Sequence, residues 1–196
     1  VGSEMCIRDR LNKEFIICVG VDPLINNIQK LGLNLSDWSK IIIDSTAEHT
    51  DAYKFQLAYF EENGIEGMSI LKNSIEYLKS TYPEKIIIGD SKRSDIGSTA
   101  VAYANAMYDY WGFDVSTVNP YFGSDSIIPF AEKNGALIVC KSSNDSSGEI
   151  QNLKIALPLQ PKEVVDLGDN KWDRKLLPKA FKKIKTIFDW EEYPID

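Results

Sequence analysis

The chain has 196 residues, of which 43% are hydrophobic and 26% are charged, and its formal net charge is −7 at pH 7. This length suits one large domain with a substantial core, and no apolar run approaches the roughly 18 residues that a membrane span requires. The acidic balance argues against nucleic acid or an anionic membrane as a partner, so we expect a small-molecule partner. Three cysteines without CxxC spacing, Cys6, Cys18 and Cys140, are typical of the reducing cytoplasm.

The two ends of the chain differ in character from the middle. The leader VGSEMCIRDR has neither the apolar stretch of a secretory signal nor the pattern of a transit peptide, so we expect residues 1–10 to be non-native or disordered. Residues 11–153 are predicted to form a (β/α) domain. Residues 154–196 are predicted to be a divergent tail, because their only long helical pattern runs from Leu177 to Trp190.

Between the ends, short β-branched runs alternate with helical patterns. The predicted strands, in chain order, are EFIICVGVDP (14–23), AYKFQL (52–57), KIIIGDSK (85–92), DVSTVNP (114–120) and ALIVCKSS (136–143). The predicted helices are LSDWSKIIIDSTAEHT (35–50), MSILKNSIEYLKS (68–80), DIGSTAVAYANAMYDYW (95–111) and SDSIIPFAEKN (124–134). Ser36 or Asp37 is the expected N-cap of the first helix. This rhythm predicts an α/β fold with a parallel sheet of right-handed βαβ units.

Polar residues distinguish a closed barrel from an open doubly wound sheet. They gather where each predicted strand ends, at Asp22, at Lys54 with Gln56, at Asp90 with Lys92, and further along at Asn119, Ser142 and Ser143. Several strands that feed one polar focus are typical of a (β/α)8 TIM barrel. No G-x-G-x-x-G follows the first strand, which weakens a dinucleotide-binding alternative.

The segment GDSKRSDIG, residues 89–97, places alternating charges directly after an apolar strand. Strand alternation predicts that Ile88, Asp90 and Lys92 point to the same side. Such a segment alone is commonly a solvated loop with fortuitous ion pairs. The matching position of Lys54 in another βα unit favours a functional site instead, because a desolvated charge network is costly unless every charge is paired.

The same segment resembles a known family. DSKRSDIGST is similar to the D-x-K-x-x-D-I-G-x-T segment of orotidine 5'-phosphate decarboxylases, and VGVDP, YKFQ, VNPYFGSDSIIPF and VCKSSNDSS extend the resemblance from Phe15 to Gln151. The most similar subgroup writes K-R-x-D-I-G-S-T-A, and Ser142 stands where that subgroup usually has threonine. The resemblance implies a (β/α)8 barrel, of which about five units are recognisable before residue 151.

The resemblance also implies catalytic roles. Lys92 would be the proton donor, and Asp90 would face the substrate carboxylate. Lys54 and Asp95 would complete a charge network. Loss of carbon dioxide from C6 of orotate leaves a carbanion with no conjugated sink, and this family uses no cofactor and no metal. An ammonium group placed beside C6 would stabilise that carbanion and then protonate it.

The remaining implied roles concern binding. Asp22 would bind the ribose hydroxyls, and Ser143 would hydrogen-bond the pyrimidine, with Ser142 as the alternative. Gln56 and Asn144 are further substrate-binding candidates. In the implied homodimer, Asp95 and Thr99 would be donated across the interface.

Three alternatives stand beside this interpretation. The chain could be a catalytically impaired fragment, because the tail offers no convincing match to the family's phosphate-binding glutamine and arginine. A magnesium-dependent sugar-phosphate decarboxylase or aldolase of the same superfamily would need a carboxylate on the second strand, where this chain has Lys54. A hydrolytic triad would need a catalytic histidine, and the sole histidine, His49, is expected to be a surface or packed residue late in a helix.

Overall fold

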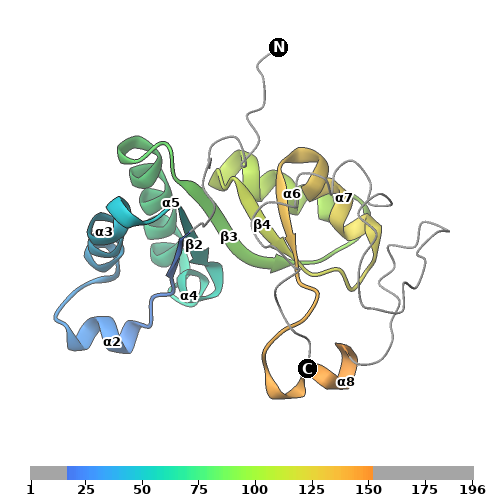
Figure 1. Cartoon of the computed structure of the whole chain (residues 1–196), viewed down its shortest axis with the longest axis horizontal. Coiled ribbons are helices and arrows are strands. Elements are labelled where there is room, and N and C mark those ends of the chain that lie inside the picture. The colour runs from blue at the N-terminus through green and yellow to red at the C-terminus, as the bar shows by residue number, and fades with distance from the viewer. Residues whose placement is uncertain (1–16, 152–196) are drawn as a thin grey trace, which may run out of the picture. The chain divides into compact units, whose positions relative to one another are not determined.

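The computed structural model describes residues 17–151 (Figure 1). The predicted leader, residues 1–10, and the predicted tail, residues 154–196, lie outside the described residues. The described residues form two compact units, residues 17–91 with 105–117 and residues 92–104 with 118–151. Each unit is described by itself below.

The first unit contains the strands and helices that carry most of the predicted site. In chain order its elements are β1 (Cys18–Val21), α2 (Ile25–Lys30), α3 (Leu35–Thr46), the 3-10 turn η1 (Ala47–His49), β2 (Ala52–Gln56), α4 (Leu57–Glu61), α5 (Gly64–Thr81), most of β3 (Ile86–Arg93), the π-helical turn η2 (Ala106–Trp111) and most of β4 (Val115–Val118). The second unit contains the ends of β3 and β4 together with α6 (Gly97–Asn105), α7 (Ser124–Lys133), β5 (Gly135–Ile138), the 3-10 turn η3 (Asp145–Ser147) and α8 (Gly148–Gln151).

The strands follow one another in the sheet in the order β1-β2-β3-β4-β5. β1 pairs with β2 in parallel, with Gly20 opposite Lys54, and β2 pairs with β3 in parallel, with Gln56 opposite Asp90. Each strand is followed by at least one helix, as the sequence predicts. The predicted α/β fold of parallel βα units is confirmed.

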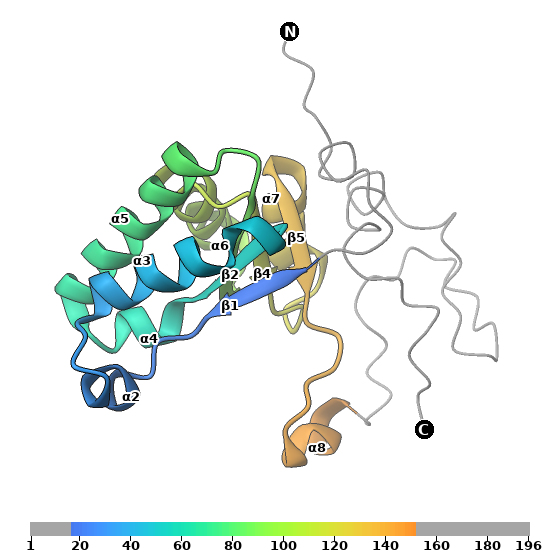
Figure 2. The same cartoon turned by 60° about the vertical axis from the view of Figure 1, so that its left-hand side comes forward.

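Helices α3 and α5 pack beside one another on one face of this unit (Figure 2). Tyr53 and Phe55 of β2 are fully buried. The Tyr53 hydroxyl donates to the carbonyl of Ile43 in α3 at 2.9 Å. Because side chains alternate along a strand, the intervening residue Lys54 faces the other side of the sheet. The apolar face of β2 therefore fixes the direction of its polar face.

Local capping differs in part from the expectation. The N-cap of α3 is Asn34 rather than Ser36 or Asp37, because the Asn34 side chain accepts the Asp37 amide at 2.8 Å and donates to the Asp37 carboxylate at 2.8 Å. This reciprocal pair satisfies one of the amide donors that every helix start leaves open.

The predicted helix 95–111 is present, but its last turn, η2, is π-helical and ends at Gly112, whose φ of 82° is left-handed.

Strand β3 carries one extra residue relative to β4. The Asp114 amide donates to the Ile87 carbonyl at 2.8 Å, and the Asn119 amide donates to the Arg93 carbonyl at 2.9 Å. Between these bonds β3 advances from 87 to 93, whereas β4 advances only from 114 to 119. A regular ladder would instead bring residue 120 to the Arg93 carbonyl, and Pro120 has no N–H.

We assign this β-bulge to Lys92. Its φ of 45° is left-handed, and no other residue except glycine has a positive φ in the part of the chain that the structure describes. The expectation from strand alternation assumed an extended backbone through residue 92, and the backbone of Lys92 departs from that assumption. The direction of the Lys92 side chain stays a prediction.

The second unit has its own small core. Ile127 and Phe130 of α7 are fully buried, and Ala136 of β5 is 2% exposed. The Val139 amide donates to the Val118 carbonyl at 3.0 Å, which ties the end of β5 to the end of β4. In this unit too, helix and strand contribute to a common core.

We predict that Gly67→Ala destabilises the fold by about 1–3 kcal/mol. A Cβ at Gly67 would lie 2.1 Å from the backbone carbonyl oxygen of Phe60, so α5 could no longer approach α4 as closely. Urea unfolding would measure the loss. Gly20→Ala is the matched control, because a Cβ there meets nothing nearer than 3.5 Å. Equal stability of the Gly67→Ala variant and the parent chain would contradict this packing argument.

Candidate active site

A buried carboxylate, Asp90, lies at the centre of the polar residues of the first unit. Asp90 is 7% exposed. Its Oδ2 accepts hydrogen bonds from Lys54 Nζ at 3.0 Å and from Gln56 Nε2 at 3.0 Å. Its Oδ1 accepts a hydrogen bond from Thr117 Oγ1 at 2.9 Å. We call Asp22, Lys54, Gln56, Asp90 and Thr117 the Asp90 cluster.

Sheet register explains why these residues meet. Gln56 stands opposite Asp90 in the parallel pairing of β2 and β3. Lys54 lies two residues before Gln56 and therefore faces the same side of the sheet. Two donors on β2, Lys54 and Gln56, thus converge on one carboxylate of the neighbouring strand β3, as the sequence spacing of Lys54 and Asp90 predicts.

Asp22 extends the cluster to the end of β1. Gly20 of β1 stands opposite Lys54, and Asp22 follows two residues later, directly after β1 ends. The Lys54 ammonium lies 3.6 Å from Asp22 Oδ1, so Lys54 bridges two carboxylates. The Lys54 side chain is 30% exposed, whereas that of Asp22 is 47% exposed. The cluster therefore has a buried end at Asp90 and a solvent-facing end at Asp22.

The electrostatics of the cluster favour a charged Lys54. Burial lowers the pKa of the Lys54 ammonium, but the hydrogen bond to Asp90 and the negative charges of Asp90 and Asp22 raise that pKa by more. The net pKa lies above the ordinary value of 10.5. Lys54 is therefore a fixed positive charge at neutral pH rather than a proton-transfer group.

The sequence analysis missed Thr117. This residue lies in β4, where Ser116 and Thr117 are both buried although both are polar. Ser116 faces the opposite side of the strand, and its hydroxyl meets the Ser91 hydroxyl at 2.9 Å. Two consecutive polar residues inside the short strand VSTV were the available signal, because buried hydroxyls need partners.

The other predicted site residues belong to the second unit. Lys92 is exposed and has a left-handed backbone, and Arg93 lies 5.4 Å from the ring of Tyr103 in a cation–π contact. The Asp95 carboxylate accepts the amide of Ile96 at 2.8 Å just before α6 begins. Thr99 is exposed on the first turns of α6. These positions are reported for the second unit alone.

Ser143 and Asn144 lie in the segment after β5. Asn144 Oδ1 accepts the Ser142 hydroxyl at 2.6 Å, and Asn144 Nδ2 donates to the Ser146 hydroxyl at 3.0 Å. Ser143 is exposed between these bonded residues. These local hydrogen bonds hold the Asn144 side chain between Ser142 and Ser146.

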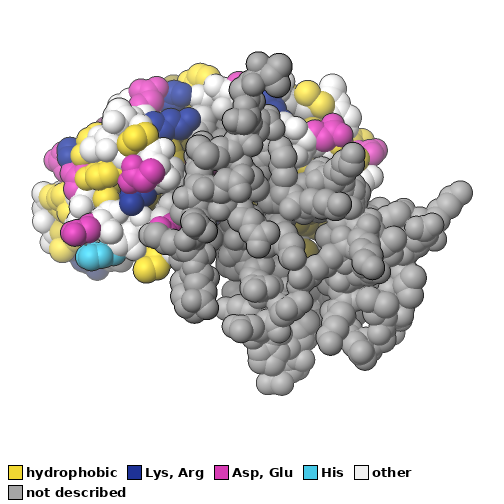
Figure 3. Space-filling view, turned by 45° about the horizontal axis from the view of Figure 1, so that its top comes forward, with side chains coloured by type: hydrophobic (Ala, Val, Ile, Leu, Met, Phe, Trp, Pro, Cys, Tyr) yellow, Lys and Arg dark blue, Asp and Glu magenta, His cyan; other side chains and the backbone are white. Residues whose placement is uncertain are grey.

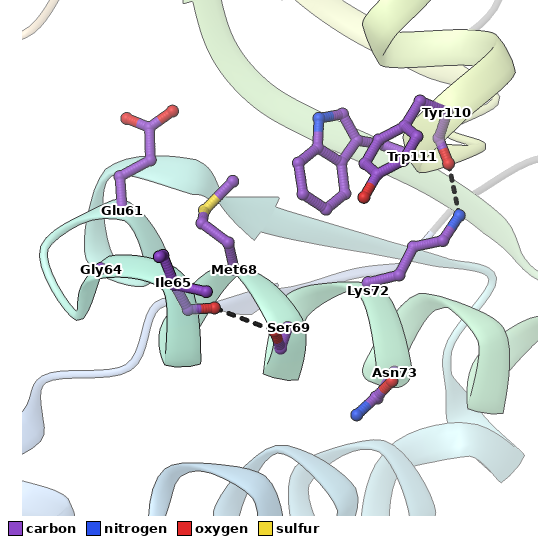
Figure 4. Close-up of a pocket in the computed structure, with 9 residues that line it drawn as sticks. All are labelled: Glu61, Gly64, Ile65, Met68, Ser69, Lys72, Asn73, Tyr110 and Trp111. Carbon is purple, nitrogen blue, oxygen red and sulfur yellow. Dashed lines mark hydrogen bonds between the residues drawn. The ribbon is translucent and has the colours of Figure 1, made fainter.

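A hollow of about 510 Å³ lies elsewhere on the first unit, beside α5 and η2 (Figure 4). Ile65, Met68 and Trp111 form much of its lining, and the Lys72 ammonium donates to the Tyr110 carbonyl there. None of the lining residues belongs to the Asp90 cluster. Its two charged lining groups, the Glu61 carboxylate and the Lys72 ammonium, lie at opposite sides of the hollow (Figure 4), so it is the weaker candidate for chemistry.

The described surface offers neither a metal cluster nor a membrane span. Within residues 17–151 no three His, Cys, Asp or Glu side chains are grouped to hold a metal ion. None of the helices in that range is both long and apolar enough to cross a membrane. On the face drawn in Figure 3, basic and acidic side chains of the described residues lie next to one another rather than in a patch of one sign.

Charged side chains at the carboxyl ends of neighbouring parallel strands define a class, the α/β proteins of the (β/α)8-barrel type. Residues 16–173 match the model of the orotidine 5'-phosphate decarboxylase / HUMPS family. This match covers most of the chain. The chain therefore belongs to the orotidine 5'-phosphate decarboxylase / HUMPS family. The family match ends at residue 173, and the domain boundary at residue 153 stays a prediction.

Individual relatives agree with the family match. The chain is 37% identical over 166 residues to an orotidine 5'-phosphate decarboxylase of Christiangramia forsetii, with 82% of the chain and 61% of the relative covered. It is 35% identical over 164 residues to that of Cellvibrio japonicus, with 79% and 59% covered. The structure of Leishmania donovani OMP decarboxylase is similar with a TM-score of 0.67 at 33% identity, covering 77% of this chain and 60% of that one. The chain thus spans about three fifths of the length of these relatives.

We predict that Lys54→Met destabilises the chain by about 2 kcal/mol. The substitution removes the Lys54 ammonium, 3.0 Å away, from the Asp90 carboxylate, whose side chain is 8% exposed. Asp90→Asn added to Lys54→Met should recover part of the loss, because the buried negative charge is then removed. Lys40→Met is the control, since the Lys40–Asp44 pair is exposed and should matter little. Equal urea stability of parent and Lys54→Met would contradict the prediction.

The stability that Lys54 contributes should depend on pH. Because its folded-state pKa lies above 10.5, the contribution is fully present below that pH and is lost as the pH rises through the raised folded value. Urea unfolding of the parent and of Lys54→Met at pH 8 and above pH 10.5 would test this. The difference between the two proteins should be constant near neutrality and should shrink at the alkaline end. A difference that grows with pH would show that the sign is wrong.

Proposed function

We propose that the chain is part of an enzyme that decarboxylates orotidine 5'-phosphate to uridine 5'-phosphate in pyrimidine biosynthesis. The observation that carries the proposal is the Lys54–Asp90 pair on the adjacent parallel strands β2 and β3, two residues before the bulge at Lys92. Family membership and relatives named as orotidine 5'-phosphate decarboxylases support the same reaction. The substrate partner is accordingly a small nucleotide.

Lys92 is the proposed proton donor. The bond between C6 and the carboxylate breaks, carbon dioxide leaves, and the electron pair remains on C6. The Lys92 ammonium stabilises this carbanion electrostatically and then transfers a proton to it, which forms the C6–H bond and leaves a neutral amine that solvent reprotonates. A left-handed backbone at a residue other than glycine costs about 1–3 kcal/mol and is typical of functional positions, which supports this role.

The other charged and polar residues of the site have proposed roles in positioning and binding the substrate. Asp90 faces the departing carboxylate and orders the ammonium groups, while Lys54 holds the Asp90 carboxylate in place. Asp22 binds the ribose hydroxyls from the solvent-facing end of the cluster. Gln56, Ser143 and Asn144 are proposed to contact substrate.

The assembly and location are part of the same proposal. We infer a homodimer in which Asp95 and Thr99 are donated to the partner's site, and a location in the cytoplasm. Both residues lie at or near the start of α6, next to the charged segment. Sedimentation of the chain with and without Asp95→Arg would test the interface, and an unchanged dimer would contradict the placement of Asp95 there.

A magnesium-dependent reaction of the same superfamily is less well supported. The Lys54 ammonium lies within 3.6 Å of both the Asp22 and the Asp90 carboxylates, so a cation already occupies the position where a metal ion would bridge them. Turnover should therefore persist in excess EDTA. Turnover that requires added Mg²⁺ would favour the alternative.

The proposed reaction is tested by following the ultraviolet absorbance of orotidine 5'-phosphate. We expect turnover by the parent chain and a fall in kcat/KM of at least about a thousandfold in Lys92→Ala, because the stabilising charge and the proton are both lost. Lys79→Ala, which removes an exposed lysine from the last turn of α5, should retain activity. Full activity of Lys92→Ala would overturn the assignment of Lys92. No turnover by a folded parent would instead identify the chain as a catalytically impaired piece of the enzyme.

A further inference from the structure

We propose that Thr117 is a positioning residue for the reaction, whose hydroxyl fixes the orientation of the Asp90 carboxylate. The inference rests on the proposed function and assigns a role to a residue outside the predicted site. Thr117 acts through Asp90.

The two oxygens of Asp90 are held from opposite neighbours. Oδ2 is bonded from β2, by Lys54 and Gln56, and Oδ1 is bonded from β4, by Thr117. β2 and β4 flank β3 in the sheet. The terminal torsion of an aspartate is soft and broad, so donors on one oxygen alone leave the carboxylate plane poorly defined. The Thr117 hydroxyl adds a hydrogen bond to the other oxygen and so helps to fix the plane of the carboxylate.

Burial makes this hydrogen bond consequential. Thr117 is 9% exposed and Asp90 is 7% exposed. Water has little access to replace a donor there, and a hydrogen bond to a charged group at low dielectric is stronger than one at the surface. Loss of the hydroxyl would therefore change the orientation of the carboxylate rather than exchange one donor for a water molecule.

The backbone of Thr117 also contacts β3, next to Asp90. Its carbonyl accepts the Ser91 hydroxyl at 3.1 Å, and that hydroxyl also meets Ser116 Oγ at 2.9 Å. Ser91 is the residue between Asp90 and the bulge residue Lys92. Thr117 thus holds the Asp90 side chain on one face of β3 and the Ser91 side chain on the other, directly before the backbone turns at Lys92.

A packing role is the structural alternative, because β-branched residues are favoured in strands. Two substitutions separate the roles. Thr117→Val keeps the shape and removes the hydroxyl, whereas Thr117→Ser keeps the hydroxyl and removes the methyl group. A packing residue would be damaged more by Ser than by Val, and a positioning residue would be damaged more by Val than by Ser.

The first test is kinetic and uses the full chain. We expect Thr117→Val to lower kcat about ten- to a hundredfold with KM changed less than about threefold, and Thr117→Ser to stay within about threefold of the parent. This split arises because Asp90 orientation affects the chemical step. Parent-like kcat in Thr117→Val, or a larger loss in Thr117→Ser, would overturn the proposal.

The second test needs no turnover, so it separates failure of this inference from failure of the proposed function. A double-mutant cycle of Thr117→Val and Asp90→Asn, read by urea unfolding, should show coupling of about tenfold in the folding equilibrium constant. The same cycle between Thr117→Val and Ser69→Ala, on a different element, should show none. Absence of coupling between Thr117 and Asp90 would overturn the proposal even if the parent enzyme is active. Coupling in an inactive parent would support the Thr117–Asp90 contact and identify the chain as a catalytically impaired piece of the enzyme.

Discussion

A carboxylate that is almost completely buried imposes the strongest constraint on this structure. Removing an ion from water costs several kcal/mol, and only partners with good geometry offset that cost. Asp90 obtains its partners from β2 and β4 at once, through Lys54, Gln56 and Thr117. Any shift of one strand against another would leave the charge unpaired, so the relative register of three strands is tied to this one group.

Apolar packing on the opposite side of the sheet helps to orient the residues that bind Asp90. Tyr53 and Phe55 alternate with Lys54 and Gln56 along β2, so the packing of one pair against the helices aims the other pair. Gly89 alternates with Asp90 in the same way, and a side chain at Gly89 would lie 2.7 Å from the ring of Phe113. The missing side chain lets Phe113 pack against β3 directly behind the charged residue. Packing and electrostatics are therefore encoded by neighbouring residues of the same strands.

The sequence is informative where a pattern is local. The β-branched runs predict the strands, and the matched positions of Lys54 and Asp90 predict their contact, because parallel register follows from repeated βα units. Three features lie beyond such reasoning. Asn34 replaces the predicted N-cap because three short polar residues stand close together where α3 begins, and the backbone geometry selects one of them. Thr117 is chosen by cross-strand pairing, which no single segment reveals. The bulge depends on two strands together, since it arises from the count of residues on β3 relative to β4.

Pro120, which follows β4, restricts the register in which β3 and β4 can pair. If β3 and β4 stayed in step to their ends, the Arg93 carbonyl would face a ring nitrogen that carries no hydrogen, and this acceptor would lose the backbone donor it has from Asn119. Pro120 thus raises the free energy of the in-step pairing and leaves the offset pairing as the favoured one. A residue that takes no part in the charge network thereby protects the carboxyl end of β3 against sliding by one position.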